Sequence, residues 1–333
     1  MAAENLWKKT PPVIERIEAL MKFATAGDPI TGLKWTRKTT EKIANELKSI
    51  DIQVCSNTVG RLLKNMGFSL RVNHKKIASG GKKVTAEDQR NRDKQFRYIG
   101  DLRESFAKRC LPIISVDSKK KEKIGNFKNQ GATWRRKSKM VNDHDFPTYS
   151  VGKGLPFGIY DTITNLGSVY LGTTCDTPAF AVDSISKWWK EEGMKGYPDA
   201  KELYILADSG GSNSARSRVW KYRLQTKMCD QYGLSITVSH YPPGASKWNP
   251  IEHRLFSEIS KNWSGEPLET YEKALKLIRT TKTSTGLKVK AHFVRKHYKT
   301  GEKVSDSEMD SLSIKPHTKF PTWNYTLNPI TRM

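Results

Sequence analysis

Three acidic residues occur where carboxylates could take part in chemistry. Asp117 follows the apolar segment IISV, and Asp208 follows LYILA. Both segments are typical of strands, so both aspartates are expected at carboxyl ends, the edge where open α/β sheets usually place ligand sites. Glu252 lies in HYPPGASKWNPIEH, residues 240–253, at the start of a helix that follows a third strand. The three carboxylates can converge if these strands are neighbours.

Glu252 also has a purely structural interpretation. Asn249 is a favoured N-cap residue, Pro250 suits the first helical position, and Glu252 at the third position would complete a capping box. On this segment alone, capping is the simpler reading. A single aspartate after a strand is likewise often a turn residue or a cap. The two roles are compatible, since a capping carboxylate still has an oxygen to offer.

Converging carboxylates repel one another and raise their own pKa values, so they need a counter-charge. Mg²⁺ prefers oxygen ligands and keeps positions open for water and phosphate oxygens. Two ions about 3.5–4 Å apart can stabilise both the attacking and the leaving oxygen of a phosphodiester. We therefore expect two Mg²⁺ ions per site, with Mn²⁺ as a substitute. No Ser-His-Asp or Cys-His arrangement is recognisable, and Ser209 is expected in a turn.

The overall charge indicates a polyanionic partner. The chain of 333 residues carries 58 basic and 34 acidic residues, a net charge of +24. Nucleic acid is the simplest partner for such an excess, although a merely soluble basic surface would give the same count. No apolar run approaches membrane-spanning length. The four cysteines form no Cys-x-x-Cys pair, and the first residues do not resemble a signal peptide, so we expect a cytoplasmic, nucleoid-associated protein.

The first eighty residues favour short helices. TTEKIANELKSI follows a Thr39 cap, and a tight link leads to a second helix, TVGRLLKNMGF, after a Ser56 cap. A helix-turn-helix is expected, with the second helix in the major groove and Asn57, Arg61 and Lys64 pointing outward to DNA. The alternative is a small helical bundle with a solvated basic face.

From residue 111 the pattern changes to strand, hairpin, helix, strand, helix, strand and helix. This order predicts an α/β domain in which a mixed sheet is flanked by helices. The hairpin is expected to turn at Asn165-Leu166-Gly167, and Thr85-Ala-Glu-Asp88 resembles a capping box that opens a long connecting helix. The predicted organisation is a helix-turn-helix region over 1–80, a connecting helix over 81–110, a catalytic domain over 111–286, and a C-terminal strand and tail over 287–333.

Three segments carry a resemblance to a known family. SVDSKKKEKIGNFKNQG, ILADSGGSN and YPPGASKWNPIEHRLF resemble, in this order, the three motif blocks of DDE transposases from bacterial insertion sequences, in particular those of the Rhodopirellula-type group. The resemblance implies a ribonuclease-H-like catalytic core of the integrase superfamily and divalent-metal-dependent strand transfer. It maps the three catalytic carboxylates onto Asp117, Asp208 and Glu252.

Three functions remain open at this point. A transposase would bind the terminal repeats of its element, join them to target DNA, and act as at least a dimer on DNA. A metal-dependent nuclease without strand transfer would use the same ligands. A non-enzymatic DNA-binding regulator derived from a transposase would be marked by loss of a carboxylate, and none is lost.

The residues around the carboxylates have weaker assignments. Basic residues in two segments could contact DNA phosphates, or could belong to a solvated turn and an ordinary basic loop: Lys119, Lys120 and Lys121, and Arg135 and Arg136 beside Trp134. Asp161, Asp176 and Asp183 are expected to be hairpin, cap and surface residues, with Asp176 the first replacement if Asp117 is not catalytic.

Overall fold

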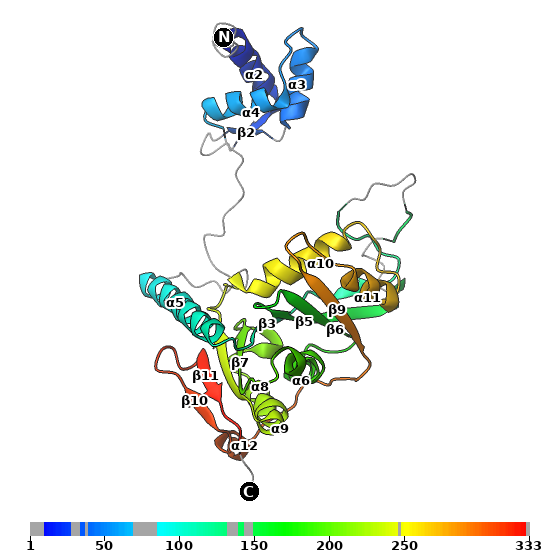
Figure 1. Cartoon of the computed structure of the whole chain (residues 1–333). Coiled ribbons are helices and arrows are strands. Elements are labelled where there is room, and N and C mark those ends of the chain that lie inside the picture. The colour runs from blue at the N-terminus through cyan, green and yellow to red at the C-terminus, as the bar shows by residue number, and fades with distance from the viewer. Residues whose placement is uncertain are drawn as a thin grey trace. The chain divides into compact units, whose positions relative to one another are not determined.

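The computed structural model describes residues 10–27, 34–36, 39–68, 85–131, 139–142, 149–245 and 248–330 (Figure 1). The chain divides into two compact units, Met1–Lys76 and Ile77–Met333, which are described separately.

The N-terminal unit is a small helical body with one short hairpin. Its elements are α2 (Thr10–Ala24), β1 (Thr25–Gly27), β2 (Lys34–Thr36), α3 (Thr40–Lys48) and α4 (Ser56–Asn65), with β1 antiparallel to β2. Its core is built from residues at helical spacing on three helices: Ile17, Ile43, Ala44, Leu47, Val59 and Leu62. The apolar periodicity of the sequence therefore marked these helices correctly.

Two local predictions in this unit need correction. Thr39 caps α3 as expected, through a bond from the Lys42 N–H to the Thr39 hydroxyl. Ser56, however, is the first residue of α4, and Cys55 occupies the cap position, where its Sγ lies 3.2 Å from the Thr58 hydroxyl. The segment TTEKIANELKSI, expected to be helical throughout, is helical only as far as Lys48, and its last residue, Ile50, is 46% exposed.

The larger unit is built on a nine-stranded mixed sheet. Its strands are β3 (Ile113–Ser118), β4 (Glu122–Ile124), β5 (Gly152–Asp161), β6 (Leu166–Gly172), β7 (Glu202–Ala207), β8 (Ser235–His240), β9 (Lys288–Val294), β10 (Ile314–Pro316) and β11 (Asn324–Leu327). Eight of them follow the order β10-β11-β8-β7-β3-β5-β6-β9, and β4 pairs with β5. Strands β3, β7 and β8 run parallel at the centre, while β5 is antiparallel to both β3 and β6.

Helical segments cover both faces of this sheet (Figure 1). They are α5 (Ala86–Lys108), α6 (Pro178–Trp188), η2 (Trp189–Gly193), α7 (Met194–Gly196), η3 (Gly211–Asn213), α8 (Arg218–Leu224), η4 (Gln225–Cys229), α9 (Asp230–Tyr232), η6 (Glu252–Phe256), α10 (Ser257–Asn262), α11 (Tyr271–Arg279) and α12 (Asp306–Asp310). Alternate strand residues serve the two faces. Ile114 and Val116 pack with α6 and α8, whereas Ile113 packs with α5.

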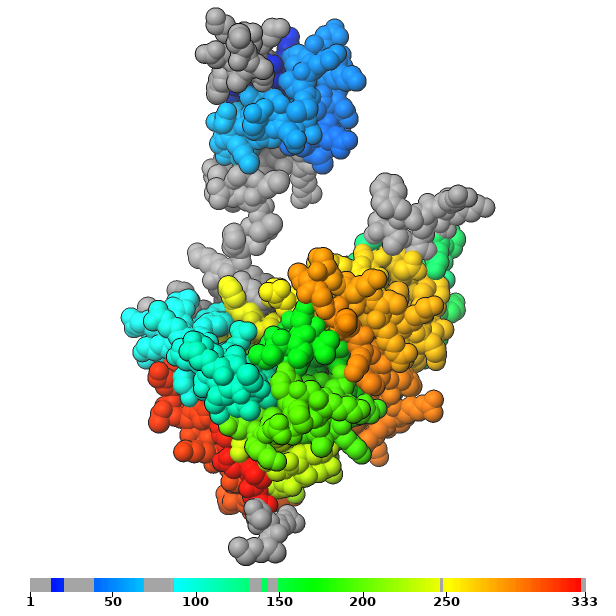
Figure 2. Space-filling view, in the orientation of Figure 1, coloured from blue at the N-terminus to red at the C-terminus, as the bar shows by residue number. Residues whose placement is uncertain are grey.

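Helix α5 begins with the predicted capping box. The Asp88 N–H donates to the Thr85 hydroxyl, and the Thr85 N–H donates to the Asp88 carboxylate. Further along α5, the buried Gln95 amide exchanges hydrogen bonds with Asn324 at the start of β11. Figure 2 shows α5 in cyan beside the C-terminal strands in red, the two segments that this amide pair joins.

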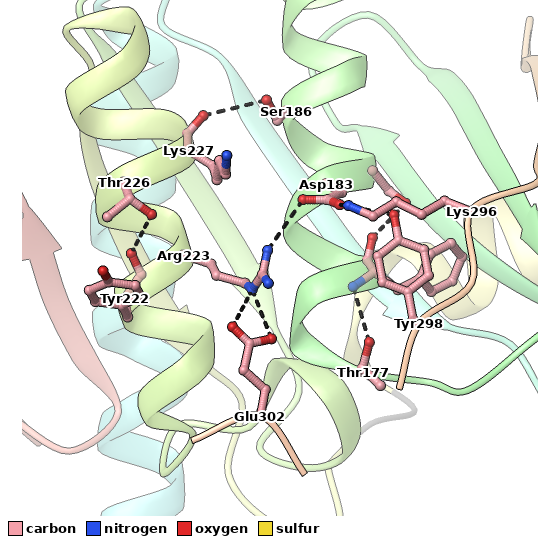
Figure 3. A network of polar contacts seen from close by, with 12 residues as sticks. Thr177, Asp183, Ser186, Tyr222, Arg223, Thr226, Lys227, Lys296, Tyr298 and Glu302 are labelled. Carbon is pink, nitrogen blue, oxygen red and sulfur yellow. Dashed lines mark hydrogen bonds and ion pairs between the residues drawn. The ribbon is translucent and has the colours of Figure 1, made fainter. Parts of the chain in front are cut away.

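The last part of the chain is integrated into the same sheet. Strand β9 pairs parallel with β6 at one edge, and β11 pairs antiparallel with β8 toward the other. The segment between them is held by Asp183 of α6 and Arg223 of α8 (Figure 3). Lys296 lies 2.6 Å from Asp183, and the Arg223 guanidinium lies 2.8 Å from Glu302.

The predicted mixed sheet flanked by helices is confirmed. The hairpin between β5 and β6 turns at residues 162–165, so Asn165, in the left-handed region with φ of 57°, closes the turn, and Leu166 and Gly167 already belong to β6. Among the described residues, no helix is both long and apolar enough to cross a membrane.

Candidate active site

Asp117 and Asp208 lie side by side because their strands are parallel neighbours. The last paired residues of β3 and β7 are Val116 and Ala207. Asp117 is the next residue of β3, and Asp208 directly follows the end of β7. Adjacent strands in a sheet are about 4.8 Å apart, so residues at matching positions present their side chains close together on one face. Asp117 is 8% exposed and Asp208 is half-buried.

Glu252 reaches this edge because the start of its helix is bonded to β3. The Ile251 N–H donates to the Ser115 hydroxyl at 3.1 Å, and that hydroxyl also bonds the Asn249 side-chain oxygen. The Asn249 amide nitrogen donates to the Val116 carbonyl at 3.3 Å. These bonds fix the residues just before Glu252 against the residues just before Asp117.

Close backbone approach supports the same placement. A Cβ at Gly158 of β5 would lie 2.6 Å from the Phe256 ring and 2.8 Å from the Ile251 side chain. Only glycine leaves room for η6 to lie this close to the sheet, because real Cβ contacts are longer than this.

The capping box predicted at Asn249 is not the role of that side chain. Asn249 is fully buried, and among the described residues its amide bonds Ser115 and Val116 rather than the first turn of its own helix. The Glu252 N–H instead donates to the Asn249 main-chain carbonyl at 3.1 Å. The Asn249 side chain therefore joins its helix to β3 and does not cap that helix.

The electrostatics of Asp117 reflect both burial and its acidic neighbours. Burial contributes most to raising the pKa of Asp117 to about 8, followed by repulsion from Asp208 and then from Glu252. The Ser118 N–H, which donates to Asp117 at 2.7 Å, and the Asn249 amide oppose this rise. All three predicted carboxylates therefore act on one another through space.

Asp208 and Glu252 show the same direction of change. Burial raises the pKa of Asp208 to about 6, with repulsion from Asp176 and Glu252 adding to the rise and the Gly210 N–H opposing it. Burial also raises the pKa of Glu252, while Lys119 and His253 lower it. Clusters of carboxyl groups with raised pKa values are typical of sites that bind cations or transfer protons.

Asp176 is a fourth carboxylate at this site, where the sequence suggested a cap residue. It lies between β6 and α6, accepts a hydrogen bond from the Ser118 hydroxyl at 2.9 Å, and contributes to raising the pKa of Asp208. The available signal was its place four residues after an apolar strand. An ordinary turn residue would have the same position in the sequence, so the site role of Asp176 could be recognised only from the packing of its loop against Ser118.

His240, at the end of β8, positions the backbone of Asp208. Its Nδ1 bonds the Asp208 carbonyl at 2.8 Å, and its Nε2 bonds the Tyr325 hydroxyl at 3.2 Å. The Trp220 indole donates to the same hydroxyl at 3.0 Å. Burial lowers the pKa of His240 to about 4, so this imidazole is neutral, with the proton on Nδ1. Sequence reasoning missed it because its partner Tyr325 lies 85 residues away.

The donor set suits a hard divalent cation in its chemistry. Asp117, Asp208, Asp176 and Glu252 offer only carboxylate oxygens. The pKa values of Asp117, Asp208 and Glu252 are raised, which reflects a cost of ionisation that a nearby cation would relieve. In the described part of the chain, no group of three or more acidic, histidine or cysteine side chains is arranged as a ready metal site. Mg²⁺ commonly takes only one or two protein carboxylates and completes its shell with water and phosphate, so the residues fit such an ion.

The basic residues after Asp117 differ from one another. Lys119 is half-buried, lies 2.6 Å from Glu122, and has its ammonium 4.7 Å from the centre of the Trp263 ring. Lys120 and Lys121 are exposed. Arg135 and Arg136 lie outside the described residues.

The N-terminal candidates share one exposed helix. Asn57, Arg61 and Lys64 all lie on α4 and are exposed, and Arg61 donates to the Thr58 hydroxyl at 3.4 Å. The spacing of three and four residues puts them on one side of the helix. Their contact with DNA and the helix-turn-helix assignment stay predictions.

Comparison with known proteins identifies the class of protein to which this fold and site belong. The family model described as Rhodopirellula transposase DDE domain matches residues 16–329. The chain belongs to this family, and it is therefore a transposase, an enzyme of the polynucleotidyl transferase type. The predicted ribonuclease-H-like fold class agrees with this membership and with the mixed sheet.

Solved structures with a similar chain are complexes of the Mos1 transposase. The Mos1 paired-end complex with the left transposon end is 13% identical, with a TM-score of 0.44, over 79% of this chain and 68% of that chain. The Mos1 mariner paired-end complex with Mn is 15% identical, with a TM-score of 0.41, over 79% and 69%. The Mos1 strand transfer complex is 14% identical, with a TM-score of 0.43, over 79% and 68%. No match was found among curated proteins.

Proposed function

We propose that this transposase binds the ends of an insertion sequence and catalyses divalent-metal-dependent DNA cleavage and strand transfer, with Asp117, Asp208 and Glu252 as the metal-binding carboxylates. The observation that carries the proposal is that the three groups share one edge of the sheet: Asp117 lies in β3, Asp208 directly follows the neighbouring parallel strand β7, and the start of η6 is hydrogen-bonded to β3. Repulsion from Asp208 and Glu252 adds to burial in raising the pKa of Asp117. A fold that keeps such repulsion without a cation would be destabilised for no structural gain.

The residues of this chain would divide the work as follows. Asp117 is the most buried of the three carboxylates, and the Ser118 N–H holds one of its oxygens. The His240 ring bonds the main-chain carbonyl of Asp208 and so fixes its backbone, and the bonds from Asn249 to β3 fix the position of Glu252. The carboxylates would hold two Mg²⁺ or Mn²⁺ ions, which would supply activation of the attacking oxygen and neutralise the leaving one.

Two features support DNA as the partner. The net charge of +24 attracts a polyanion, and neutralised phosphates release counterions, which strengthens binding at low salt. Lys120 and Lys121, exposed directly after the catalytic strand, would contact phosphates near the scissile bond. The Mos1 paired-end complex is described as containing the left transposon end, which is the kind of partner that we propose here. Two DNA ends require two active sites, so we propose at least a dimer on DNA, acting in the cytoplasm.

Replacing Asp208 with Asn tests the catalytic assignment. We expect Asp208→Asn to lose cleavage of end-containing duplex DNA in Mg²⁺ by at least about a thousandfold, because one of the ion-binding oxygens loses its charge. Binding of the same DNA should stay within about twofold of wild type. The matched control is Asp199→Asn, an exposed aspartate outside the site, which should cleave normally. Equal loss of binding and cleavage in Asp208→Asn would contradict the assigned role.

The same assay separates strand transfer from plain hydrolysis. Joined products between end-containing DNA and a second duplex are expected from a transposase that carries out strand transfer. Cleavage without joined products would favour the nuclease alternative.

Removal of residues 1–80 tests the N-terminal unit. We propose that Asn57, Arg61 and Lys64 read the element's ends, so the truncated protein should lose preference for end-containing DNA while keeping Mn²⁺ binding by titration. A truncated protein that still selected those ends would refute the helix-turn-helix assignment.

A further inference from the structure

A cavity has Asp208 in its wall. It has a volume of about 760 Å³ and is lined by residues from four segments that meet at the carboxyl ends of β7 and β8. The lining includes one carboxylate, two cations and an aromatic ring: Asp208, Arg216, Lys221 and Trp323. Cavities of this size hold a single ligand of nucleotide dimensions, whereas a duplex would not enter.

The two basic side chains that line the cavity, Arg216 and Lys221, differ from the basic residues near them in the chain, which are paired with carboxylates. Residues 216–223 include four basic side chains, and the two that do not line the cavity are paired. Arg218 lies 2.5 Å from Asp306, and Arg223 lies 2.8 Å from Glu302. Arg216 and Lys221 make no ion pair with any residue that the structure describes.

Lys221 carries the stronger signal of the two. It is half-buried, its ammonium lies 5.2 Å from the centre of the Tyr325 ring, and burial lowers its pKa. A desolvated ammonium without a carboxylate is costly, and an anionic ligand in the cavity would offset that cost.

Trp323 adds an aromatic wall to the same cavity. It is half-buried, stacks on Phe320 with ring centres 5.4 Å apart, and its main-chain carbonyl accepts from the His240 N–H at 2.9 Å. The backbone of this tryptophan is therefore tied to the strand end that also positions Asp208. Aromatic side chains next to basic ones are the combination that holds single-stranded nucleic acid, because every base has a face that can stack.

We propose that this cavity holds one unpaired nucleotide of the DNA strand that passes over Asp208, with Trp323 stacking on the base and Arg216 and Lys221 contacting phosphate. This proposal rests on the proposed function, because it assumes that the cleaved DNA strand passes over Asp208, which forms one wall of the cavity. It implies that the transposase unpairs DNA next to the bond it cuts.

Binding of fluorescein-labelled hexathymidylate to the full chain tests the pocket. Measurement without divalent metal keeps the result independent of the metal chemistry. Trp323→Ala should weaken binding by about 5- to 100-fold through lost stacking, with Trp323→Phe recovering most of it. The slope of log K against log salt should not change in Trp323→Ala.

Substitution of the cations should change that slope. Arg216→Gln removes an exposed side chain and should reduce the slope by about 0.7, the value for one phosphate contact on a single strand. Lys221→Met should do the same. Lys195→Ala and Tyr149→Ala, exposed side chains outside the cavity, are the matched controls and should bind as wild type.

Each outcome decides the proposal. Hexathymidylate binding unchanged in Trp323→Ala would overturn it, and so would an unchanged salt slope in Arg216→Gln. If Arg216→Gln weakened hexathymidylate binding and Trp323→Ala did not, Arg216 would make a simple phosphate contact, and the proposal of a nucleotide pocket would be overturned. If Asp208→Asn still cleaved DNA, the proposed metal chemistry would fail, whereas the hexathymidylate results would stand.

Discussion

Asp117→Asn should stabilise the metal-free protein, and the size of the effect should depend on pH. The native pKa of Asp117 is raised from its ordinary value of 3.8 to about 8, so the native state binds this proton more tightly than the unfolded state does. Stability contributed by the protonated group is therefore fully present below about pH 4 and is lost as the pH rises toward about 8. Asparagine has nearly the same shape and never carries the charge.

The magnitude follows from the same pKa values. The native and unfolded pKa values of Asp117 differ by about four, and each pKa unit is worth about 1.4 kcal/mol, so the gain in the free energy of unfolding has an upper limit of about 6 kcal/mol. Asp208 titrates in the same range and shares the repulsion, so the measured gain is expected at about 1–3 kcal/mol above pH 8. For a unit of this size, that is a rise in Tm of about 3–10 °C.

Thermal unfolding of the full chain, followed by tryptophan fluorescence at several pH values, measures this effect. Seven of the nine tryptophans lie in the unit Ile77–Met333, so the signal reports mainly on this larger unit. Asp183→Asn is the matched control, because its carboxylate lies among cations, 2.6 Å from Lys296 and 3.6 Å from Arg223 (Figure 3). That variant should lose stability at neutral pH. A gain in Asp117→Asn that was equal at about pH 4 and about pH 8, or no gain at all, would refute the argument from charge repulsion.

Three further predictions address the same site. Millimolar Mn²⁺ should raise the Tm of the wild-type protein at about pH 8 by several degrees and leave Asp117→Asn nearly unchanged, and an equal rise in both would mean that the ion binds elsewhere. Asn249→Ala should cost about 1–3 kcal/mol in urea unfolding, because it leaves the buried Ser115 hydroxyl and Val116 carbonyl short of partners, and it should reduce cleavage by displacing Glu252; normal cleavage would show that this anchor is dispensable. The pKa of His240 is lowered to about 4, so the stability contributed by its neutral form is present above about pH 6.5 and is lost as the pH falls toward about 4. His240→Gln should lack this part of the acid sensitivity. If the urea midpoint of His240→Gln varied with pH as that of the wild type does, this role of His240 would be excluded.

The sequence alone was enough to determine the fold class and to nominate the acidic residues. Helix periodicity, the Thr85 capping box and the apolar strands are local patterns, and they predicted α3, α5 and the central strands correctly. Asp117 and Asp208 were recognisable because strand ends are visible in sequence and ligand sites collect at one edge of a parallel sheet.

Only the tertiary structure decided which segments meet. The sequence favoured Asn249 as a helix cap, yet its buried amide serves β3; Asp176 was expected to be a cap residue, yet it raises the pKa of Asp208. The TWNYTLNP tail proved to include strand β11, whose Tyr325 supports His240. The physical reason is the same in each case. A side chain's type limits the bonds that it can make, but which partner it finds depends on strand order and helix docking, and these are set by the burial of the whole chain rather than by neighbouring residues.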